Sequence, residues 1–360
     1  MKKMRVAIIG QGRSGHDIHG KFFLSPENDK VQVVAVVDKL ADRREKAKQE
    51  FGCDCYETYQ ELFDRKDIDL VVNASFSQMH YAISRDLICH GFSVLSEKPF
   101  GATYLECMDL IACAKQHGVT VAAFHQSLYN PMFKKLKEII AEGRLGNVYQ
   151  FSMKYSGFAR RWDWQTLQAC CAGSVYNSGP HPIGQALDLL GWDENTEVAF
   201  SKLNTILTSG DAEDYGKIIL TAPNKPVVDI EVNSSDAFAG DFTFKVFGSK
   251  GTLLCGSSDY KMKFINTDEL EPRPVIREPL ADANGKPIYC SEKLNMQEER
   301  GTVTGSAFTT AVKEYYDMLY DTVINGAPLA IQAEHAAQVI RIIETCHAHN
   351  PLPLKYTLEV

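Results

Sequence analysis

The sequence predicts an α/β protein whose N-terminal part is a doubly wound parallel sheet and whose C-terminal part is an α/β domain with a large, mostly antiparallel open sheet. Three observations support this. Residues 1–124 alternate short apolar strands with helical segments, a pattern typical of parallel sheets. A glycine-rich turn follows the first strand directly. Beyond residue 125, strand-like segments succeed one another without intervening helices, as in antiparallel sheets.

The composition excludes several classes of protein. The chain has 360 residues, which favours two domains at about 100–200 residues each. We place them at residues 1–124 and 125–360. The net charge of -8 argues against a nucleic-acid partner. No apolar run approaches the roughly 18 residues of a membrane span, and the N-terminus lacks the order of a signal peptide. We therefore expect a cytoplasmic protein without a membrane partner.

The ten cysteines are scattered along the chain. None of the close pairs has the C-x-x-C spacing of a zinc or redox site. A chain of this length needs no disulfides to hold its core, so we expect free thiols. No set of His, Cys, Asp and Glu has metal-ligand spacing in the sequence, and we predict no metal.

Residues 6–9 read as a buried strand that ends in a G-x-G-x-x-G turn. Gly10 permits the tight turn, Gly12 lets the backbone approach a pyrophosphate, and Gly15 lets the next helix pack close to the strand. The helix N-terminus offers free N–H groups and a partial positive charge to the phosphates. We expect the whole turn to bind a dinucleotide: Gly10, Gln11, Gly12, Arg13, Ser14 and Gly15.

The second strand, residues 31–37, ends at Asp38, 23 positions after Gly15. Dinucleotide-binding folds carry an acid about 20 residues beyond the turn, where it accepts hydrogen bonds from the adenosine ribose. A carboxylate also repels a 2′-phosphate, so we predict NAD, with NADP less favoured. Lys39 and Arg43 are near enough to offset part of this repulsion.

The remaining elements of the first domain continue the alternation. In order they are helices at 42–51 and 57–64, a strand at 69–74, a helix at 78–91, a strand at 93–95, a helix at 104–117 and a strand at 119–124. Ligands of such sheets sit beyond the carboxyl ends of the strands. Those ends are Gly10, Asp38, Ser75, Glu97 and His125.

The segment Glu97-Lys98-Pro99 follows the strand at 93–95. Together with the glycine turn, the acid after the second strand and the spacing of Ser75 and His80, it resembles the Gfo/Idh/MocA oxidoreductase family over nearly the whole chain. The resemblance implies that Lys98 lies near the nicotinamide and the substrate hydroxyl. Burial and a positive ring would depress its pKa, so that it can relay a proton. A cis bond before Pro99 is plausible in this turn.

The family often has Thr-Pro-Asn-x-x-His after the preceding strand. Here the Pro and Asn are absent, but Ser75, Phe76 and His80 keep positions that would line the cofactor. His80 is equally compatible with a helix-capping role. The resemblance adds Glu97 and Gln126 to the expected cofactor contacts.

The segment from Gly173 to His181 resembles the family's G-G-x-x-x-D-x-G-x-H stretch. The resemblance implies that His181 is a general acid/base at the substrate hydroxyl. The family's aspartate is Asn177 here, which can orient a hydroxyl but cannot act as a base. The acid that often follows the histidine is Gly184. We expect proton transfer to rest on Lys98 and His181, with Asn177 beside them.

Two arginines and two tryptophans precede this segment, and they suit a carbohydrate because aromatic faces stack on C–H surfaces. With Tyr129, the expected substrate-binding residues are Arg160, Arg161, Trp162 and Trp164. The arginines also suit a phosphate or carboxylate. A salt-bridge cluster with buried tryptophan is the structural alternative.

The second domain begins with a helix at 132–142. Strands are expected at 148–155, 197–207, 216–221, 227–233, 242–247 and 251–255, then a long polar excursion at 266–300 and helices at 306–324 and 333–347. The two final helices are long enough to pack back on the first domain, and the sequence leaves this arrangement open. A large exposed sheet face favours a partner, and we expect a homodimer or homotetramer through it.

The sequence therefore favours an NAD-dependent dehydrogenase acting on a secondary alcohol of a carbohydrate-like small molecule: a sugar, an inositol or a glycoside. Two alternatives stay open. One is an enzyme that cleaves glycosides through a transient keto-sugar while NAD stays bound. The other is a non-catalytic NAD-binding sensor, which the replacements at positions 177 and 184 keep open.

Overall fold

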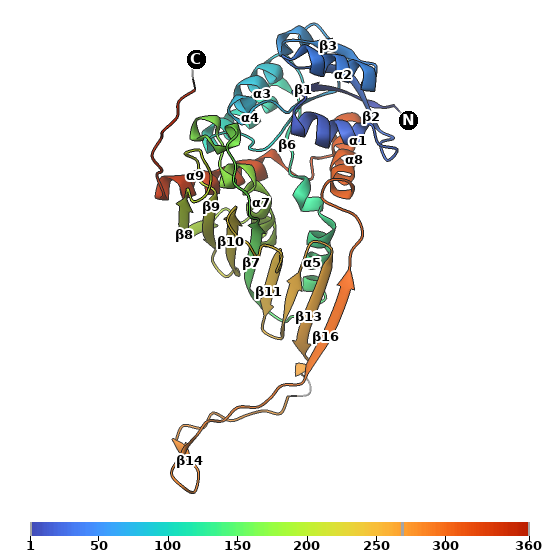
Figure 1. Cartoon of the computed structure of the whole chain (residues 1–360). Coiled ribbons are helices and arrows are strands. Elements are labelled where there is room, and N and C mark those ends of the chain that lie inside the picture. The colour runs from blue at the N-terminus through green and yellow to red at the C-terminus, as the bar shows by residue number, and fades with distance from the viewer. Residues whose placement is uncertain (1, 268–269, 359–360) are drawn as a thin grey trace.

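The computed structural model describes residues 2–267 and 270–358, arranged around two main sheets (Figure 1). The first sheet has six strands in the order β3-β2-β1-β4-β5-β6, and its neighbours all pair in parallel. Its strands are β1 (Met4–Ile9), β2 (Val31–Val37), β3 (Asp54–Tyr56), β4 (Leu70–Asn73), β5 (Val94–Ser96) and β6 (Val121–Ala123). The predicted doubly wound parallel sheet is confirmed. Sequence analysis missed β3, because three partly exposed residues carry no apolar run.

Helices connect these strands. They are η1 (Arg13–Gly20), α1 (Lys21–Phe23), α2 (Ala41–Phe51), η2 (Tyr59–Leu62), η3 (Ser77–Met79), α3 (His80–Cys89) and α4 (Tyr104–His117). Local chemistry sets their ends. The Thr103 hydroxyl accepts from the backbone N–H of Glu106 and starts α4, which ends at Gly118 with φ +67°.

The second sheet has eight strands in the order β16-β13-β12-β11-β7-β10-β9-β8. They are β7 (Val148–Ser156), β8 (Glu197–Asn204), β9 (Tyr215–Thr221), β10 (Val227–Asn233), β11 (Phe244–Gly248), β12 (Gly251–Cys255), β13 (Asp259–Ile265) and β16 (Met296–Thr302). Only the β7–β10 pair is parallel within this sheet. The predicted mostly antiparallel sheet is confirmed.

One expectation about this domain is wrong in part. The polar excursion at 266–300 ends inside β16, and β13 precedes it. β13 alternates buried and exposed residues from Asp259 onward, so a period-two signal was present in the sequence. Between β13 and β16 the chain runs out in a long arm that carries the two-stranded hairpin β14 (Leu280–Ala281) and β15 (Pro287–Ile288) (Figure 1).

Several helices lie between or against the sheets. They are η4 (Gln126–Tyr129), α5 (Pro131–Ala141), η5 (Trp164–Thr166), η6 (Gln168–Cys170), α6 (Ser174–Asn177), α7 (Pro180–Leu189), α8 (Thr310–Asn325) and α9 (Ala333–His349). α8 packs on the first sheet: Tyr315 and Tyr316 are fully buried in one apolar cluster with Met4 and Phe124. α9 contacts both α4 and β8, and so joins the two layers.

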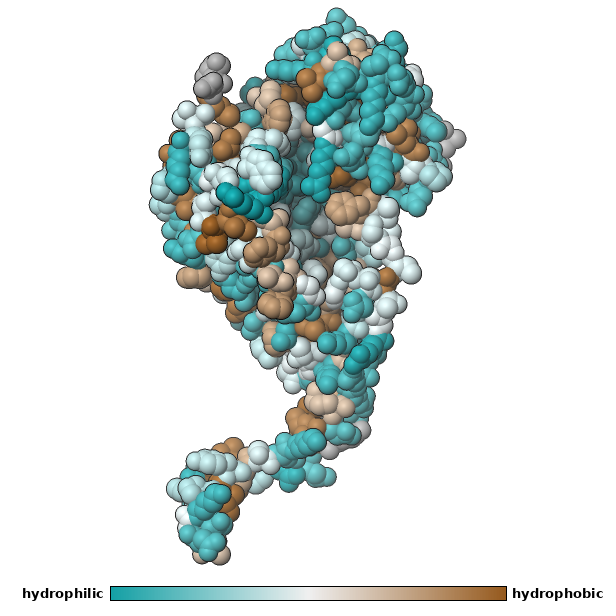
Figure 2. Space-filling model, in the orientation of Figure 1, coloured by the Kyte–Doolittle hydropathy of each residue, from teal (hydrophilic) through white to brown (hydrophobic). Residues whose placement is uncertain are grey.

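The space between the two sheets is hollowed. Figure 2 shows a recess below the first-domain sheet and its helices, above the second sheet. The carboxyl ends of β1, β2, β4, β5 and β6 carry the residues described next. Among the described residues, no helix is both long and apolar enough to cross a membrane.

Candidate active site

The glycine turn is built for close approach. Gly10 has φ +86°, and a Cβ there would lie 2.4 Å from the carbonyl oxygen of Ala74. A Cβ on Gly15 would lie 1.8 Å from the carbonyl oxygen of Gly10, so only glycine lets η1 start against the turn. At Gly12 a Cβ would meet no described atom within 4 Å. The open side of the turn is therefore the side on which a pyrophosphate can approach the backbone.

Asp38 closes the end of β2 and is almost fully buried. Its Oδ2 accepts from the backbone N–H of Gln11 at 2.7 Å, and its Oδ1 accepts from that of Leu40 at 2.9 Å. Arg43 places Nη1 3.5 Å from Oδ2. Oδ2 accepts from both Gln11 and Arg43, whereas Oδ1 keeps a further lone pair for a ribose hydroxyl. The nearby arginine balances much of the charge that would repel a phosphate.

A pocket of about 270 Å³ opens beside this acid. It is lined by Gln11, Gly12, Arg13, His16, Asp17, Arg43 and Lys46. Three of these side chains are permanently cationic, so the pocket suits a phosphate-bearing ligand.

The described residues fit a bound dinucleotide. The buried amide oxygens of Gln11 and Gln126 have no hydrogen-bond partner within the described chain. Buried polar atoms normally have partners, and these two lie at the carboxyl ends of β1 and β6. These two amide oxygens, the open side of Gly12 and the basic pocket together fit a ligand that has phosphates at one end and polar groups along its length.

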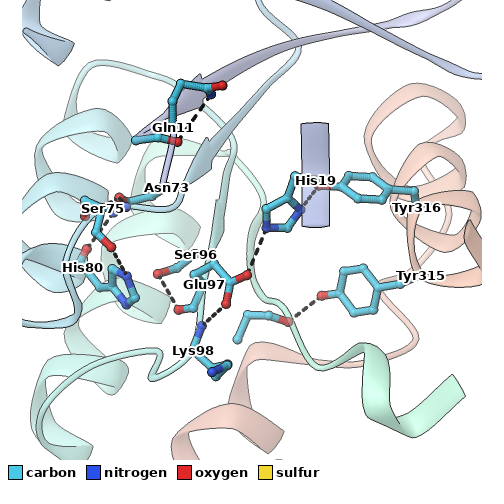
Figure 3. A network of polar contacts seen from close by, with 12 residues as sticks. Gln11, His19, Asn73, Ser75, His80, Ser96, Glu97, Lys98, Tyr315 and Tyr316 are labelled. Atoms are coloured by element: carbon cyan, nitrogen blue, oxygen red, sulfur yellow. Dashed lines mark hydrogen bonds and ion pairs between the residues drawn. The ribbon is translucent and has the colours of Figure 1, made fainter. Parts of the chain in front are cut away.

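A buried polar network supports the turn after β5 (Figure 3). The Glu97 side chain is 3% exposed and that of His19, from η1, is 0% exposed. Because a carboxylate only accepts, His19 Nε2–H donates to Glu97 Oε1 at 3.1 Å. The hydroxyl of Tyr316 in α8 lies 2.6 Å from His19 Nδ1, and Glu97 Oε2 accepts from the Lys98 N–H at 3.0 Å. Two separate segments, η1 and α8, thus hold the turn that presents Lys98.

The pKa of Glu97 reflects this environment. Burial alone raises it, but the hydrogen bond and charge of His19, with the charge of Lys98, outweigh burial and lower the pKa to about 2. Glu97 is therefore ionised and acts on the fold of the turn. The Lys98–Pro99 peptide bond is cis, as the sequence indicated.

His80 also braces this turn. Its Nδ1 lies 2.7 Å from the carbonyl oxygen of Pro99, and its Nε2 lies 3.1 Å from that of Ser75. Burial lowers its pKa. A neutral imidazole has one N–H, so it donates to one of these two carbonyls and only contacts the other; in either case His80 lies between the β4 and β5 loops. Ser75 in turn donates its hydroxyl proton to Asn73 at 2.7 Å. Both residues stand at the predicted edge of the sheet.

Lys98 meets the second domain. Its Nζ donates to the backbone carbonyl of Asn177 at 2.8 Å and to the Asn177 side-chain oxygen at 3.2 Å. Burial lowers the pKa of Lys98, and the charges of Arg13 and Arg161 lower it further, against the opposing effect of Glu97. An ammonium has three donors, so this pairing leaves one N–H for another acceptor.

A chain of amides continues behind Asn177. Gln165 donates from Nε2 to the Asn177 side-chain oxygen at 3.3 Å, and its own Oε1 accepts from Arg161. Arg161 also pairs with both oxygens of Asp163. The predicted residues Arg161, Asn177 and Lys98 are thus joined through Gln165, which sequence reasoning missed.

Two imidazoles lie close to Lys98. Burial and the positive charge of Lys98 lower the pKa of His181, on α7, to about 3. Burial, mainly, lowers the pKa of His125 to about 4. A Cβ on Gly184 would lie 3.4 Å from His125 Nδ1, which has no partner among the described residues. The glycine that replaces the family's acid therefore gives His125 its room.

The aromatic candidates divide into two groups. Phe76 of the β4 loop and Trp164 of η5 meet edge to face, with ring centroids 5.0 Å apart. By contrast, Trp162 is 79% exposed, and the exposed Arg160 donates to the Ser209 hydroxyl. Tyr129 packs edge to face on Tyr315 at 6.3 Å. The fold joins Phe76 and Trp164 across the domains and leaves Arg160 and Trp162 at the surface.

Two residues of the site, Gln165 and His19, were not predicted from the sequence. Gln165 lies in the segment that was predicted to bind substrate through its arginines and tryptophans, so its position could have been predicted. His19 sits four residues beyond Gly15 on the predicted helix. Nothing in the sequence links it to Glu97, 78 positions away.

Two family models match the chain. The Gfo/Idh/MocA oxidoreductase family's NAD-binding Rossmann fold matches residues 4–125. The Gfo/Idh/MocA C-terminal domain matches residues 133–254. Together they cover more than half of the chain.

Individual proteins are similar at low identity. The scyllo-inositol 2-dehydrogenase (NADP(+)) IolW of Bacillus subtilis is 24% identical over 344 residues, covering 95% of this chain and 92% of that protein. The 2,7-anhydro-N-acetylneuraminate hydratase of Mediterraneibacter gnavus is 24% identical over 180 residues, covering 49% and 47%. The solved structure of the oxidoreductase YvaA from Bacillus subtilis superposes with a TM-score of 0.78 at 21% identity, covering 96% of this chain and 95% of that one.

Proposed function

The chain belongs to the Gfo/Idh/MocA family of NAD(P)-binding oxidoreductases, and we propose that it transfers a hydride between a nicotinamide and a secondary alcohol or ketone of a sugar, an inositol or a glycoside. One observation carries the proposal. Lys98, at the carboxyl end of β5, donates two hydrogen bonds to Asn177 of the second domain. An amine is thereby held at the cofactor edge of the sheet with one donor still free.

NAD or NADP, when bound, supplies the hydride chemistry of its nicotinamide ring. The chain's own residues bind it through the glycine turn, Asp38, Gln11 and Gln126. In oxidation, Lys98 as a neutral amine accepts the proton of the substrate hydroxyl, and in reduction, as an ammonium, it returns a proton to the substrate oxygen. Its lowered pKa makes that exchange easier near neutral pH.

His181 complements Lys98 as a hydrogen-bond donor. With a pKa of about 3, its imidazole is neutral at pH 7 and keeps one N–H, which donates to the substrate oxygen. The ring thereby orients the hydroxyl, and most of the proton transfer falls to Lys98. Asn177 cannot take a proton, so its role is to hold the lysine. Phe76 and Trp164 supply an apolar face for the C–H surface of a sugar ring.

The proposed site makes a specific prediction for Asn177→Asp. A carboxylate beside Lys98 Nζ would raise the pKa of the lysine, and of His181 near it. The pH optimum for oxidation should move upward, and Asn177→Ala should not reproduce the shift. An unchanged pH profile in Asn177→Asp would place Lys98 outside the proton path.

We propose NAD as the preferred cofactor because the Oδ1 atom of Asp38 keeps an acceptor lone pair for a ribose hydroxyl. The basic pocket of Arg13, Arg43 and Lys46 lowers the penalty for a 2′-phosphate, so NADP should be used with a higher KM. Initial rates with both cofactors at equal concentration measure the preference directly.

The decisive experiment follows reduced nicotinamide by absorbance. Purified protein is mixed with NAD or NADP and a panel of sugars, inositols, sugar acids and glycosides. The variants are Lys98→Ala and, as a matched control, Lys115→Ala at an exposed position of α4. Turnover of one polyol class, reduced at least about 100-fold in Lys98→Ala and unchanged in Lys115→Ala, supports the dehydrogenase. Equal rates in both variants would refute the role of Lys98.

A second candidate is cleavage or hydration of a glycoside through transient oxidation, with the cofactor bound throughout. It is favoured by the neutral site around Asn177 and by the similarity to a protein named as a hydratase. It requires product formation without accumulation of free reduced cofactor. Cofactor binding detected as a raised Tm, with neither activity in the panel, would indicate the sensor.

We further propose a homodimer or homotetramer through the open face of the second sheet, with the domain boundary at residues 124/125. Tyr149 and Phe200 are exposed on strands of that sheet. Sedimentation of the wild type and of a Tyr149→Asp, Phe200→Asp variant tests the interface. A monomeric wild type contradicts it.

A further inference from the structure

Three potential metal ligands meet at one edge of the first domain, away from the turns that carry the candidate active site. They are Cys89, the last residue of α3, and Cys113 and His117 of α4. One ligand atom from each lies within 4.8 Å of the others. Cys113 is buried at 6% exposure, whereas His117 is exposed. The cluster is thus anchored in the fold and open to solvent on one side.

The packing of the two helices creates this cluster. α3 and α4 run side by side, and residues spaced by four meet along the seam. Tyr81 and Arg85 of α3 both contact Asp109 of α4. Four residues further along each helix, Cys89 meets Cys113. His117 follows after another turn of α4, on the same face as Cys113.

The distances suit a tetrahedral ion. With Zn–S bonds of about 2.3 Å, two thiolates of one tetrahedral zinc lie about 3.8 Å apart. The Sγ atoms of Cys89 and Cys113 are 3.6 Å apart. The two cysteines need almost no movement to share one ion, and the imidazole of His117 is on the adjoining turn.

Charge also favours a cation here. Cys89 and His117 are the final residues of their helices, where the helix dipoles present partial negative charge. Arg85, the nearest cation, places Nη1 3.9 Å from Cys89 Sγ but forms an ion pair with Asp109 at 2.7 Å. The Arg85–Asp109 ion pair is nearly neutral as a unit, and Nη1 of Arg85 is still able to donate a hydrogen bond to the thiolate of Cys89.

We propose that Cys89, Cys113 and His117 form a binding site for zinc or a similar thiophilic divalent cation, with a water molecule in the fourth position. Both thiols lose their protons to solvent on binding, and neutral His117 gives a lone pair, so each ion bound releases two protons. Affinity therefore falls as pH falls. Helices of a doubly wound fold run antiparallel to its strands, which puts these helix ends opposite the cofactor edge. The site accordingly stabilises the α3–α4 packing and takes no part in the proposed reaction.

Cobalt(II) is the probe, because thiolate ligation gives it a charge-transfer band and tetrahedral geometry gives it intense visible bands. Full-length protein, reduced and freed of metal by chelator, is titrated with Co²⁺ and then with Zn²⁺. We expect saturation at one equivalent, bleaching by Zn²⁺ and a higher Tm with either ion. Cys89→Ser should lose the thiolate band. His117→Ala, on the exposed side, should weaken binding more than about tenfold, since even outer-shell changes cost that much.

Cys290→Ser is the matched control, because Cys290 is an exposed free thiol on the distant arm. It should titrate like the wild type. The proposal is overturned if the reduced wild type shows no saturable thiolate band, or if Cys89→Ser and His117→Ala bind Co²⁺ with the affinity of the wild type. Both variants leave cofactor-dependent turnover untouched by design, so loss of the band and loss of activity report on separate sites.

Discussion

Replacing His19 by phenylalanine should destabilise the protein by removing the partner of a buried carboxylate. The ring of His19 lies 4.4 Å from that of Phe124, and a phenyl ring keeps this packing. Two hydrogen bonds are lost: the one from Nε2 to Glu97, which is 3% exposed, and the one between Nδ1 and the hydroxyl of Tyr316. A buried charge left without its partner is strongly unfavourable.

The magnitude follows from the pKa of Glu97. The value falls from 4.5 to about 2 in the folded protein. A difference of about 2.5 units corresponds to about 3 kcal/mol of stability at pH 7, which His19 and Lys98 supply together against the cost of burial, with His19 the larger contributor. Removing one partner of a buried pair costs about 3–5 kcal/mol, which agrees. The folded pKa is depressed, so this stability is present above pH 4.5 and is lost as pH falls toward 2. At pH 3.5 about 2 kcal/mol should remain.

Urea unfolding at pH 7 and pH 3.5 measures the loss, with constant slope m as the check that only stability changed. The double variant His19→Phe, Glu97→Gln removes the charge together with its partner and should recover a large part of the loss, because the cost lies in the unpaired carboxylate. The reasoning fails if His19→Phe costs less than about 1 kcal/mol at pH 7, a value typical of an ordinary hydrogen bond, or if the double variant is no more stable than the single one.

Three further outcomes are expected. Gly15→Ala puts a Cβ 1.8 Å from the Gly10 carbonyl oxygen. It should weaken cofactor binding sharply, measured by calorimetric titration, and lower stability by about 1–3 kcal/mol, measured as a fall in Tm. An unchanged dissociation constant for the cofactor would contradict the role of Gly15 in the binding turn. Arg43 lies beside Asp38, and Arg43→Ala should raise the KM for NADP about tenfold and leave the KM for NAD within twofold. Equal changes in the two KM values would show that Arg43 does not contribute to the choice between NAD and NADP. Burial raises the pKa of Glu213 to about 8, so the folded state holds a proton that the unfolded state has released between pH 4.5 and 8, and stability falls as pH rises through that window. Glu213→Gln should abolish this fall in stability with pH, so the Tm of the variant should rise relative to that of the wild type from pH 5 to pH 8. If the Tm of both proteins changes with pH in the same way, Glu213 is ionised in the folded protein over this range.

Much of the first domain could be read from local sequence. Buried parallel strands are continuous apolar runs, and the glycine turn is specified by sterics at single positions. At Gly15, for example, no side chain fits. The same holds for Lys98 and Asn177, which sit in recognisable segments at the ends of regular elements. β3 and β16 escaped because they are held by pairing with neighbours, and their own residues are short of apolar character.

What the tertiary structure alone decided are the contacts between distant segments. Glu97 is beside Lys98 in the sequence, but only the fold brings His19 to Glu97 across 78 positions and Tyr316 to His19 across 297 positions. Likewise Cys89 and Cys113 are 24 residues apart with no motif spacing, and they meet because two helices pack in parallel. The local sequence determines the steric limits of the backbone and the periodicity of apolar residues, and both act over only a few residues. Hydrogen bonds and ligand clusters depend on where whole elements come to rest, and that is set by the packing of the complete core.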